Sequence, residues 1–228
     1  METVVVSIGG SVLAPGEPDA EYAQRLGAAL QEIARTHRLF VVTGGGRTAR
    51  AYIEAGRALG APEPFLDALG IKVTRLNARV LLAALGRADA GKLPHTVEEA
   101  VAAGGASNLV VMGGTTPGHT TDAVAAEIAE SVGAQRLVNA TSVDGVYTAD
   151  PAKDPAARRL DRVSHDELVR LVGDSHARAG PSIVFDPMAA RTVARASIPV
   201  AVVNGRDLAA LRAAILGKPF RGTLVGSG

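Results

Sequence analysis

The chain has 228 residues, a formal net charge of +1, 47% hydrophobic residues and 21% charged residues. This composition predicts one packed globular domain and excludes a disordered chain, and the small net charge gives no basic field that would bind nucleic acid or an anionic membrane. The absence of cysteine excludes a disulfide framework, a thiolate zinc site and a cysteine nucleophile.

Short apolar, β-branched runs alternate with helical patterns along the chain. The N-terminal "METVVVSIGGSV" has no basic region and resembles a strand, so we expect a cytoplasmic protein without a membrane partner. The alternation predicts an α/β fold whose sheet is mainly parallel and has helices on both faces. Strands are expected at 3–8, 39–43, 108–112, 136–141 and 199–204, helices at 19–36, 47–59, 65–85, 121–132, 187–196 and 207–216, and loops at 86–95 and 148–159, with Asp19 as the first N-cap.

Glycine-rich or polar turn segments follow the first four predicted strands. In an open parallel sheet ligands bind beyond the carboxyl ends of the strands, where glycine lets a ligand approach the main chain and helix N-termini attract anions. One glycine pair alone is explained by a tight turn, but three such junctions predict at least two bound phosphate groups. The segments are Gly9–Ser11, Gly44–Gly46, Gly113–Thr121 and Ser142–Pro151.

Two nucleotide-binding motifs compete for these glycines. The Gly-Lys pairs at 91–92 and 217–218 are followed by Leu and Pro, so no Walker-type phosphate loop is present. "GGGRTA" at 44–49, followed by Asp67, fits the dinucleotide fingerprint and leaves an NAD-binding oxidoreductase as an alternative. This motif follows the second predicted strand, however, and leaves the other junctions unexplained.

Four segments together resemble the amino acid kinase superfamily: "SIGGSVL", "VVTGGGRTARAYIE", "VVMGGTTPGHTTDAVAAEIAE" and "NATSVDGVYTADPAKDPAARRLDRVS". The resemblance covers nearly the whole chain, and the "GGTTPGHTTDA" loop is most similar to archaeal-type uridylate (UMP) kinases. It implies Mg²⁺-dependent transfer of the γ-phosphoryl group of ATP to UMP, giving UDP and ADP in pyrimidine nucleotide biosynthesis. It also implies a three-layer sandwich around an eight-stranded sheet.

The resemblance further implies two lobes and an assembly. The N-terminal lobe, about residues 1–133, would take the acceptor UMP, and the C-terminal lobe, about 134–228, would take ATP. Relatives in the family imply a homohexamer built as a trimer of dimers. Mg²⁺ would be held mainly through the ATP phosphates, without a dedicated set of protein ligands.

Site residues are transferred by position from the same resemblance. Arg50 and Asp122 are expected to be catalytic, Asp67 to accept hydrogen bonds from the ribose, and His119 to face solvent without a catalytic role. Each of three residues also has an alternative role without substrate contact: Asp122 as a first-turn helix acid, Asp67 as a surface acid and Tyr147 as a core or lid aromatic. The UMP set is Gly45, Asp67, Thr115, Thr116, Pro117, Gly118, His119, Thr120 and Thr121, and the ATP set is Gly9, Gly10, Gly46, Arg50, Thr141, Ser142, Tyr147 and Asp150.

The chain departs from the superfamily pattern at two lysines. Ser7 occupies the position of a lysine two residues before the first Gly-Gly, and Asp186 matches a second lysine position. Arg50 and Mg²⁺ would then neutralise more of the phosphoryl charge. The missing lysines keep a non-catalytic nucleotide- or oxyanion-binding protein as an alternative. Isopentenyl phosphate kinase is disfavoured because the second glycine loop contains no histidine, whereas the choice of UMP over CMP stays open.

Overall fold

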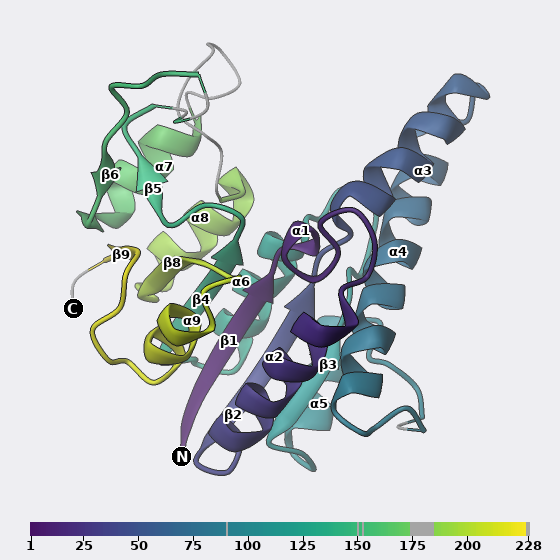
Figure 1. Cartoon of the computed structure of the whole chain (residues 1–228), viewed down its shortest axis with the longest axis horizontal. Coiled ribbons are helices and arrows are strands. Elements are labelled where there is room, and N and C mark those ends of the chain that lie inside the picture. The colour runs from purple at the N-terminus through teal and green to yellow at the C-terminus, as the bar shows by residue number, and fades with distance from the viewer. Residues whose placement is uncertain (90, 150, 152, 174–184, 227–228) are drawn as a thin grey trace.

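The central sheet contains seven strands in the order β3-β2-β1-β4-β8-β9-β7. The computed structural model describes residues 1–89, 91–149, 151, 153–173 and 185–226 (Figure 1). All neighbouring strands are parallel except β8 and β9, which are antiparallel. The strands are β1 (Glu2–Ile8), β2 (His37–Thr43), β3 (Leu109–Met112), β4 (Arg136–Thr141), β7 (Arg162–Val163), β8 (Val200–Asn204) and β9 (Thr223–Val225), and a separate antiparallel pair joins β5 (Val146–Tyr147) to β6 (Arg159–Leu160).

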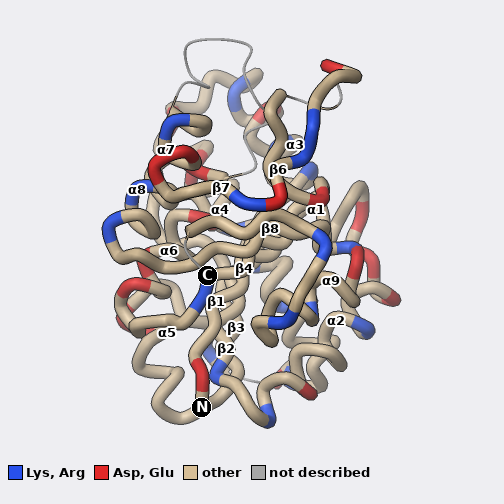
Figure 2. The backbone as a smooth tube through the Cα atoms, turned by 90° about the vertical axis from the view of Figure 1, so that its left-hand side faces the viewer, with Lys and Arg blue, Asp and Glu red and all other residues tan. Residues whose placement is uncertain are grey.

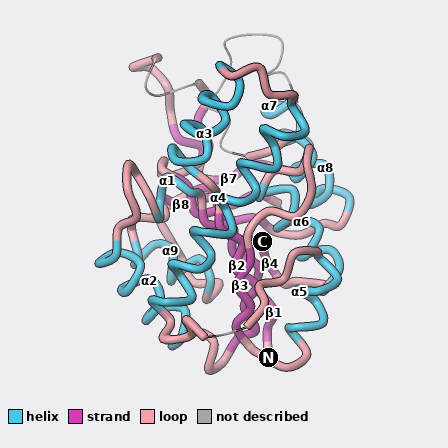
Figure 3. Tube along the Cα trace, turned by 90° about the vertical axis from the view of Figure 1, so that its right-hand side faces the viewer, coloured by secondary structure: helices cyan, strands magenta, loops and turns pink. Residues whose placement is uncertain are grey.

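Helices cover both faces of the sheet, as Figure 3 shows with the strands between two helical layers. Helices α1, α2, α4 and α9 contribute to the core on one face, and α5 to α8 contribute to the core on the other. The helices are α1 (Gly10–Leu13), α2 (Ala20–Ile33), α3 (Gly46–Ala58), α4 (Glu63–Ala84), α5 (Val97–Gly104), α6 (Thr121–Ser131), α7 (His165–Gly173), α8 (Pro187–Arg195) and α9 (Leu208–Ile215). The three-layer α/β prediction is therefore confirmed.

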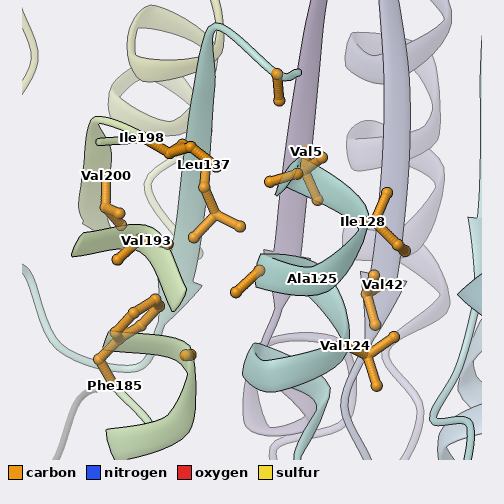
Figure 4. Packing of buried hydrophobic residues seen from close by; sticks show 14 of the residues in the cluster. Val5, Val42, Val124, Ala125, Ile128, Leu137, Phe185, Val193, Ile198 and Val200 are labelled. Atoms are coloured by element: carbon orange, nitrogen blue, oxygen red, sulfur yellow. The ribbon is translucent and has the colours of Figure 1, made fainter. Parts of the chain in front are cut away.

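The two cores explain why the central strands are almost continuously apolar. Alternate side chains of a strand point to opposite faces, so Val4 enters one core and Val5 the other. Figure 4 shows Val5 of β1 next to Ala125 of α6, and Leu137 of β4 beside Val193 of α8. Because Ile128 is fully buried, we expect its replacement by alanine to cost about 2–5 kcal/mol.

Most predicted elements are present with ends shifted by a few residues. Asp19 caps α2 by accepting a hydrogen bond from the Tyr22 amide at 2.9 Å, as predicted. The sequence patterns did not predict the short elements α1, α5, α7, β5, β6, β7 and β9. The expected eight-stranded sheet is wrong in its count, since the described residues form a seven-stranded sheet with the two-residue strands β5 and β6 paired apart from it.

Helices α3 and α4 pack against each other and project from the sheet at the right of Figure 1. Only Ala49 and Gly56 of α3 are buried. Lys, Arg, Asp and Glu are mixed over the outer elements, whereas the central strands carry few charges (Figure 2). No helix within the described ranges is both long and apolar enough to cross a bilayer.

Candidate functional site

The glycine junctions meet at one edge of the sheet. Strand β1 lies between β2 and β4, and all three are parallel, so their carboxyl ends share that edge. The Gly9 amide donates to the Ala140 carbonyl at 2.8 Å, and the Gly44 amide donates to the Ile8 carbonyl at 2.8 Å. These bonds join each junction to the neighbouring strand. The predicted gathering of the junctions is confirmed.

The first two junctions touch through their main chains. A Cβ atom on Gly10 would lie 2.0 Å from the Gly46 nitrogen and 2.4 Å from the Gly45 carbonyl carbon. Gly46 also has a φ of +62°, a conformation that favours glycine. Any side chain at Gly10 would separate the two loops. The close contact of the two junctions therefore depends on glycine at both positions.

A cleft of about 310 Å³ lies between α3, α4 and the 113–121 loop. Every residue of the expected UMP set lines it except Thr115. Ile53, Gly70, Ile71 and Thr74 were not predicted but also line the cleft. The full lining is Gly45, Gly46, Ala49, Ile53, Asp67, Gly70, Ile71, Thr74, Gly114, Thr116, Pro117, Gly118, His119, Thr120 and Thr121.

Side chains anchor the C-terminal half of the 113–121 loop, which we call the acceptor loop. Asp67 Oδ2 accepts a hydrogen bond from the Gly118 amide at 2.9 Å. Thr120 Oγ1 caps α6 by accepting from the Ala123 amide at 3.1 Å. The His119 side chain is 33% exposed and its Nδ1 lies 3.0 Å from an oxygen of Glu127, so it faces solvent in part, and its expected lack of a catalytic role stays a prediction. Glu127 belongs to α6, the helix that directly follows the loop.

Buried polar residues of α4 bind the main chain behind the glycine junctions. Thr74 Oγ1 accepts from the Gly114 amide at 2.7 Å, and Asn77 Nδ2 donates to the Gly44 carbonyl at 2.7 Å. The Thr43 hydroxyl donates to the Thr74 carbonyl at 2.9 Å. These residues were not predicted from the sequence. For Thr74 and Asn77 the signal was a polar residue on the apolar face of a predicted helix, where an unpaired polar group would be costly.

Ser7 and Asp122 form the polar centre of the site. The fully buried Ser7 hydroxyl donates to Asp122 Oδ1 at 2.8 Å. Burial, together with the nearby charge of Asp186, raises the pKa of Asp122 to about 6, against the lowering effect of the Ser7 hydrogen bond. Asp186 itself caps α8 through the amides of Met188 and Ala189. Asp122 is thus more than a solvated first-turn acid.

A second cleft of about 370 Å³ opens at the β4 and β8 side of the same edge. Ser142 and Tyr147 line it as expected, whereas Thr141 ends β4 outside the lining and Asp150 lies outside the described residues. Asp144 was not predicted as a site residue. Its partners Arg159 and Arg221 lie far from it in the chain, so the local sequence did not reveal their contact. The full lining is Ser142, Val143, Asp144, Tyr147, Pro151, Asn204, Asp207 and Arg221.

Asp144 organises this second cleft. The hydrogen bond from the Tyr147 hydroxyl, with Arg221 and Arg159 nearby, holds the pKa of Asp144 below its usual value. Arg159 and Arg221 lie 3.2 and 3.0 Å from Asp144 Oδ2. Tyr147 is therefore held in place by a carboxylate.

Arg50 is exposed on α3, about one turn past Gly46, and lines neither of the two clefts. No ion pair joins it to a carboxylate within the described part of the chain. A larger hollow of about 760 Å³ lies near Arg136, Pro199 and Phe220, at the starts of β4 and β8, and contains none of the expected site residues. The expected site residues line the two smaller clefts at the glycine-lined edge and not this larger hollow.

The parallel sheet with glycine-lined junctions at the carboxyl ends of its strands is typical of α/β proteins that bind phosphate groups. Comparison with known families then identifies the family. The model of the amino acid kinase family matches residues 2–204, and the chain belongs to this family. The resemblance seen in the sequence is confirmed.

Relatives with high similarity over their whole length are uridylate kinases. The uridylate kinase of Pyrococcus abyssi is 45% identical over 222 residues, covering 97% of this chain and 98% of the relative. That of Methanospirillum hungatei is 47% identical over 225 residues, covering 99% and 95%. The crystal structure of uridylate kinase from Archaeoglobus fulgidus, 39% identical, superposes with a TM-score of 0.87 and covers 99% of this chain and 100% of its own.

Proposed function

We propose that this chain is a UMP kinase that transfers the γ-phosphoryl group of ATP to UMP, giving UDP and ADP. The main supporting observation is the 310 Å³ cleft in which Asp67 and the acceptor loop meet the glycine-lined edge. Similarity to uridylate kinases over nearly the full chain supports the same substrate. A cleft of this size between a loop and two helices suits a small, mostly buried ligand.

The two clefts suggest how the substrates divide between the lobes. UMP would occupy the cleft of Asp67 and the acceptor loop, within the lobe of about residues 1–133. ATP would occupy the cleft of Ser142 and Tyr147, within the lobe of about 134–228, with its phosphates reaching the glycine-lined edge. Thr120, which caps the N-terminus of α6, lines the acceptor cleft, and the helix dipole favours phosphate there.

The chemistry needs positioning and charge neutralisation more than proton transfer. The attacking atom is a phosphate oxygen of UMP, so no general base is required. The Gly10 and Gly46 main chain would hold the phosphates close, and Arg50 would approach them from α3. The carboxylates of Asp122 and Asp186 are hard oxygen donors that suit Mg²⁺ together with the ATP phosphates. When bound, Mg²⁺ neutralises charge on those phosphates.

Assembly into a homohexamer, as a trimer of dimers, is part of the proposal. Its support is a set of large exposed apolar side chains on the projecting helices α3 and α4 and the turn between them, which a partner subunit would remove from water. The exposed side chains there are Tyr52 (57%), Leu59 (87%), Phe65 (53%) and Leu76 (63%). Light scattering of the wild type and of Leu76→Glu tests this: the variant should dissociate, and a monomeric wild type would refute assembly.

A parallel phosphotransfer assay tests the substrate. UMP, CMP, dTMP and isopentenyl phosphate are each offered with ATP and Mg²⁺, and UDP formation should exceed all other products. A faster reaction with CMP or isopentenyl phosphate would refute the choice of acceptor. Binding of UMP and ATP without any turnover would instead favour the non-catalytic nucleotide-binding alternative.

A further inference from the structure

Arg75 of α4 binds the main chain of the acceptor loop. Its Nε donates to the Gly114 carbonyl at 3.1 Å and its Nη2 donates to the Thr115 carbonyl at 3.1 Å. No carboxylate pairs with Arg75 among the residues that the structure describes. A part-buried guanidinium thus uses its planar fork on two consecutive peptide carbonyls. Such charge-assisted bonds are stronger than neutral ones.

The orientation of these carbonyls fixes the amides beside them. A peptide unit is planar, and in the trans form its C=O and N–H point in opposite directions. The described chain contains no cis peptide. Because the Gly114 and Thr115 carbonyls face Arg75, the amides of Thr115 and Thr116 face away from it.

These two amides have no hydrogen-bond partner within the described ranges. Gly114 and Thr116 line the acceptor cleft, whereas Arg75 does not. The two amides that point away from Arg75 thus belong to a segment that borders the cleft. Successive main-chain N–H groups of this kind attract oxygen atoms of ligands.

We infer that Arg75 is a positioning residue that presets the Thr115 and Thr116 amides to bind oxygen atoms of the acceptor nucleotide. The inference rests on the proposed function for the identity of that nucleotide. Arg75 itself touches neither substrate. Its role is to fix two donors that no other described group uses.

The rest of the loop explains why such fixing is needed. Glycine has a large backbone freedom, and the loop contains Gly113, Gly114 and Gly118. Thr74 holds the Gly114 amide and Asp67 holds the Gly118 amide, so the residues between them depend on Arg75. A preset loop loses less conformational entropy when the nucleotide binds.

The experiment compares Arg75→Met with Arg79→Met. Arg79 lies one turn further along α4, where its Nη1 donates to the Gly91 carbonyl at 3.0 Å, outside the cleft. For Arg75→Met we expect KM for UMP to rise about 10-fold, with KM for ATP changed by less than about 2-fold. Arg79→Met should change neither constant. Arg75→Lys keeps the charge but not the fork, and should restore only part of the UMP affinity.

Hydrogen exchange of the peptide spanning 113–121 supplies a readout that is independent of turnover. In the absence of nucleotide, Arg75→Met should speed exchange in this segment and Arg79→Met should not. Equal rises in both KM values, or unchanged exchange with a lower melting temperature, would overturn the inference. If the wild type failed to phosphorylate UMP, the proposed function would fall, and exchange alone would decide the role of Arg75. Should Arg75→Met not fold, Arg75→Lys and Arg75→Gln provide the same comparison.

Discussion

The Ser7 hydroxyl donates a 2.8 Å hydrogen bond to Asp122 Oδ1, linking β1 to the first turn of α6. A neutral hydroxyl stands here in place of the superfamily lysine, so it does not neutralise the Asp122 charge. Asp186 adds a second negative charge nearby, and with burial this raises the pKa of Asp122 to about 6. The free protein therefore has a carboxylate at its centre that is costly to ionise.

The first prediction concerns the cost of ionising the buried carboxyl of Asp122. The usual pKa of an Asp is 3.8, and the folded value of about 6 lies above it. The folded state then binds the proton more tightly than the unfolded state, so this stabilisation is complete below about pH 4 and is lost as the pH rises through about 6. Asp122→Asn cannot ionise. Its melting temperature should exceed that of the wild type increasingly between pH 4 and 7, while its kinase turnover falls because the carboxylate is gone.

The control is Asp166→Asn, which alters an exposed acid in the first turn of α7. It should show no comparable gain in melting temperature across that pH range. A pH-independent difference between Asp122→Asn and the wild type would contradict the raised pKa of Asp122.

The second prediction concerns Arg50. With Ser7 neutral and Asp186 negative, the exposed guanidinium on the first turns of α3 is the cation expected to reach the transferring group. Arg50→Ala should lower kcat on the order of 100-fold, as loss of charge-stabilising groups does in phosphoryl transfer. The melting temperature should change little. Arg57→Ala is the matched control, since Arg57 lies further along the same helix and pairs with Glu63. Near-normal turnover of Arg50→Ala at saturating ATP, UMP and Mg²⁺ would remove Arg50 from the mechanism.

The third prediction separates two roles of Asp67. Its Oδ2 holds the Gly118 amide, and its other oxygen is the expected ribose acceptor. Asp67→Asn keeps an oxygen that can hold the loop but loses the charge, so UMP binding should weaken by about 1–3 kcal/mol while ATP binding is preserved. Asp67→Ala should weaken UMP binding further, because the loop anchor is also lost. Calorimetric titration with each nucleotide measures both, and equal losses for UMP and ATP would indicate a folding role.

The fourth prediction concerns Gly10. A Cβ atom there would meet the Gly46 nitrogen at 2.0 Å, and a main-chain contact cannot yield as a flexible side chain can. Gly10→Ala should destabilise the protein by about 1–3 kcal/mol and lower activity by separating the two loops. Gly16→Ala places a methyl group in open space and should be neutral. Chemical denaturation measures the difference, and equal stability of the two variants would refute the contact.

Sequence patterns were sufficient for the long elements and for the family. Residues 3–8 were predicted as a strand and lie within β1, because a parallel strand buried on both faces is rich in consecutive apolar, β-branched residues such as Val4, Val5 and Val6. The acceptor loop was found because a long run rich in glycine and threonine separates a predicted strand from a predicted helix, and its role was taken from the family resemblance. Strands of two or three residues such as β7 and β9 have no periodicity to detect, and whether β5 and β6 join the central sheet depends on packing. Their placement could not be predicted from local sequence.

The sequence by itself determined the α/β layers, the glycine junctions and the membership of the amino acid kinase family, since these depend on local residue order. Only the tertiary structure decided which polar groups meet. Ser7 and Asp122 are far apart in the chain, as are Arg75 and Thr115 or Asp144 and Arg221, and each pair is brought together by the packing of helices and loops on the sheet. The raised pKa of Asp122 and the orientation of the Thr115 and Thr116 amides follow from those contacts. Desolvation and hydrogen-bond direction are properties of the folded surroundings, and no run of adjacent residues specifies them.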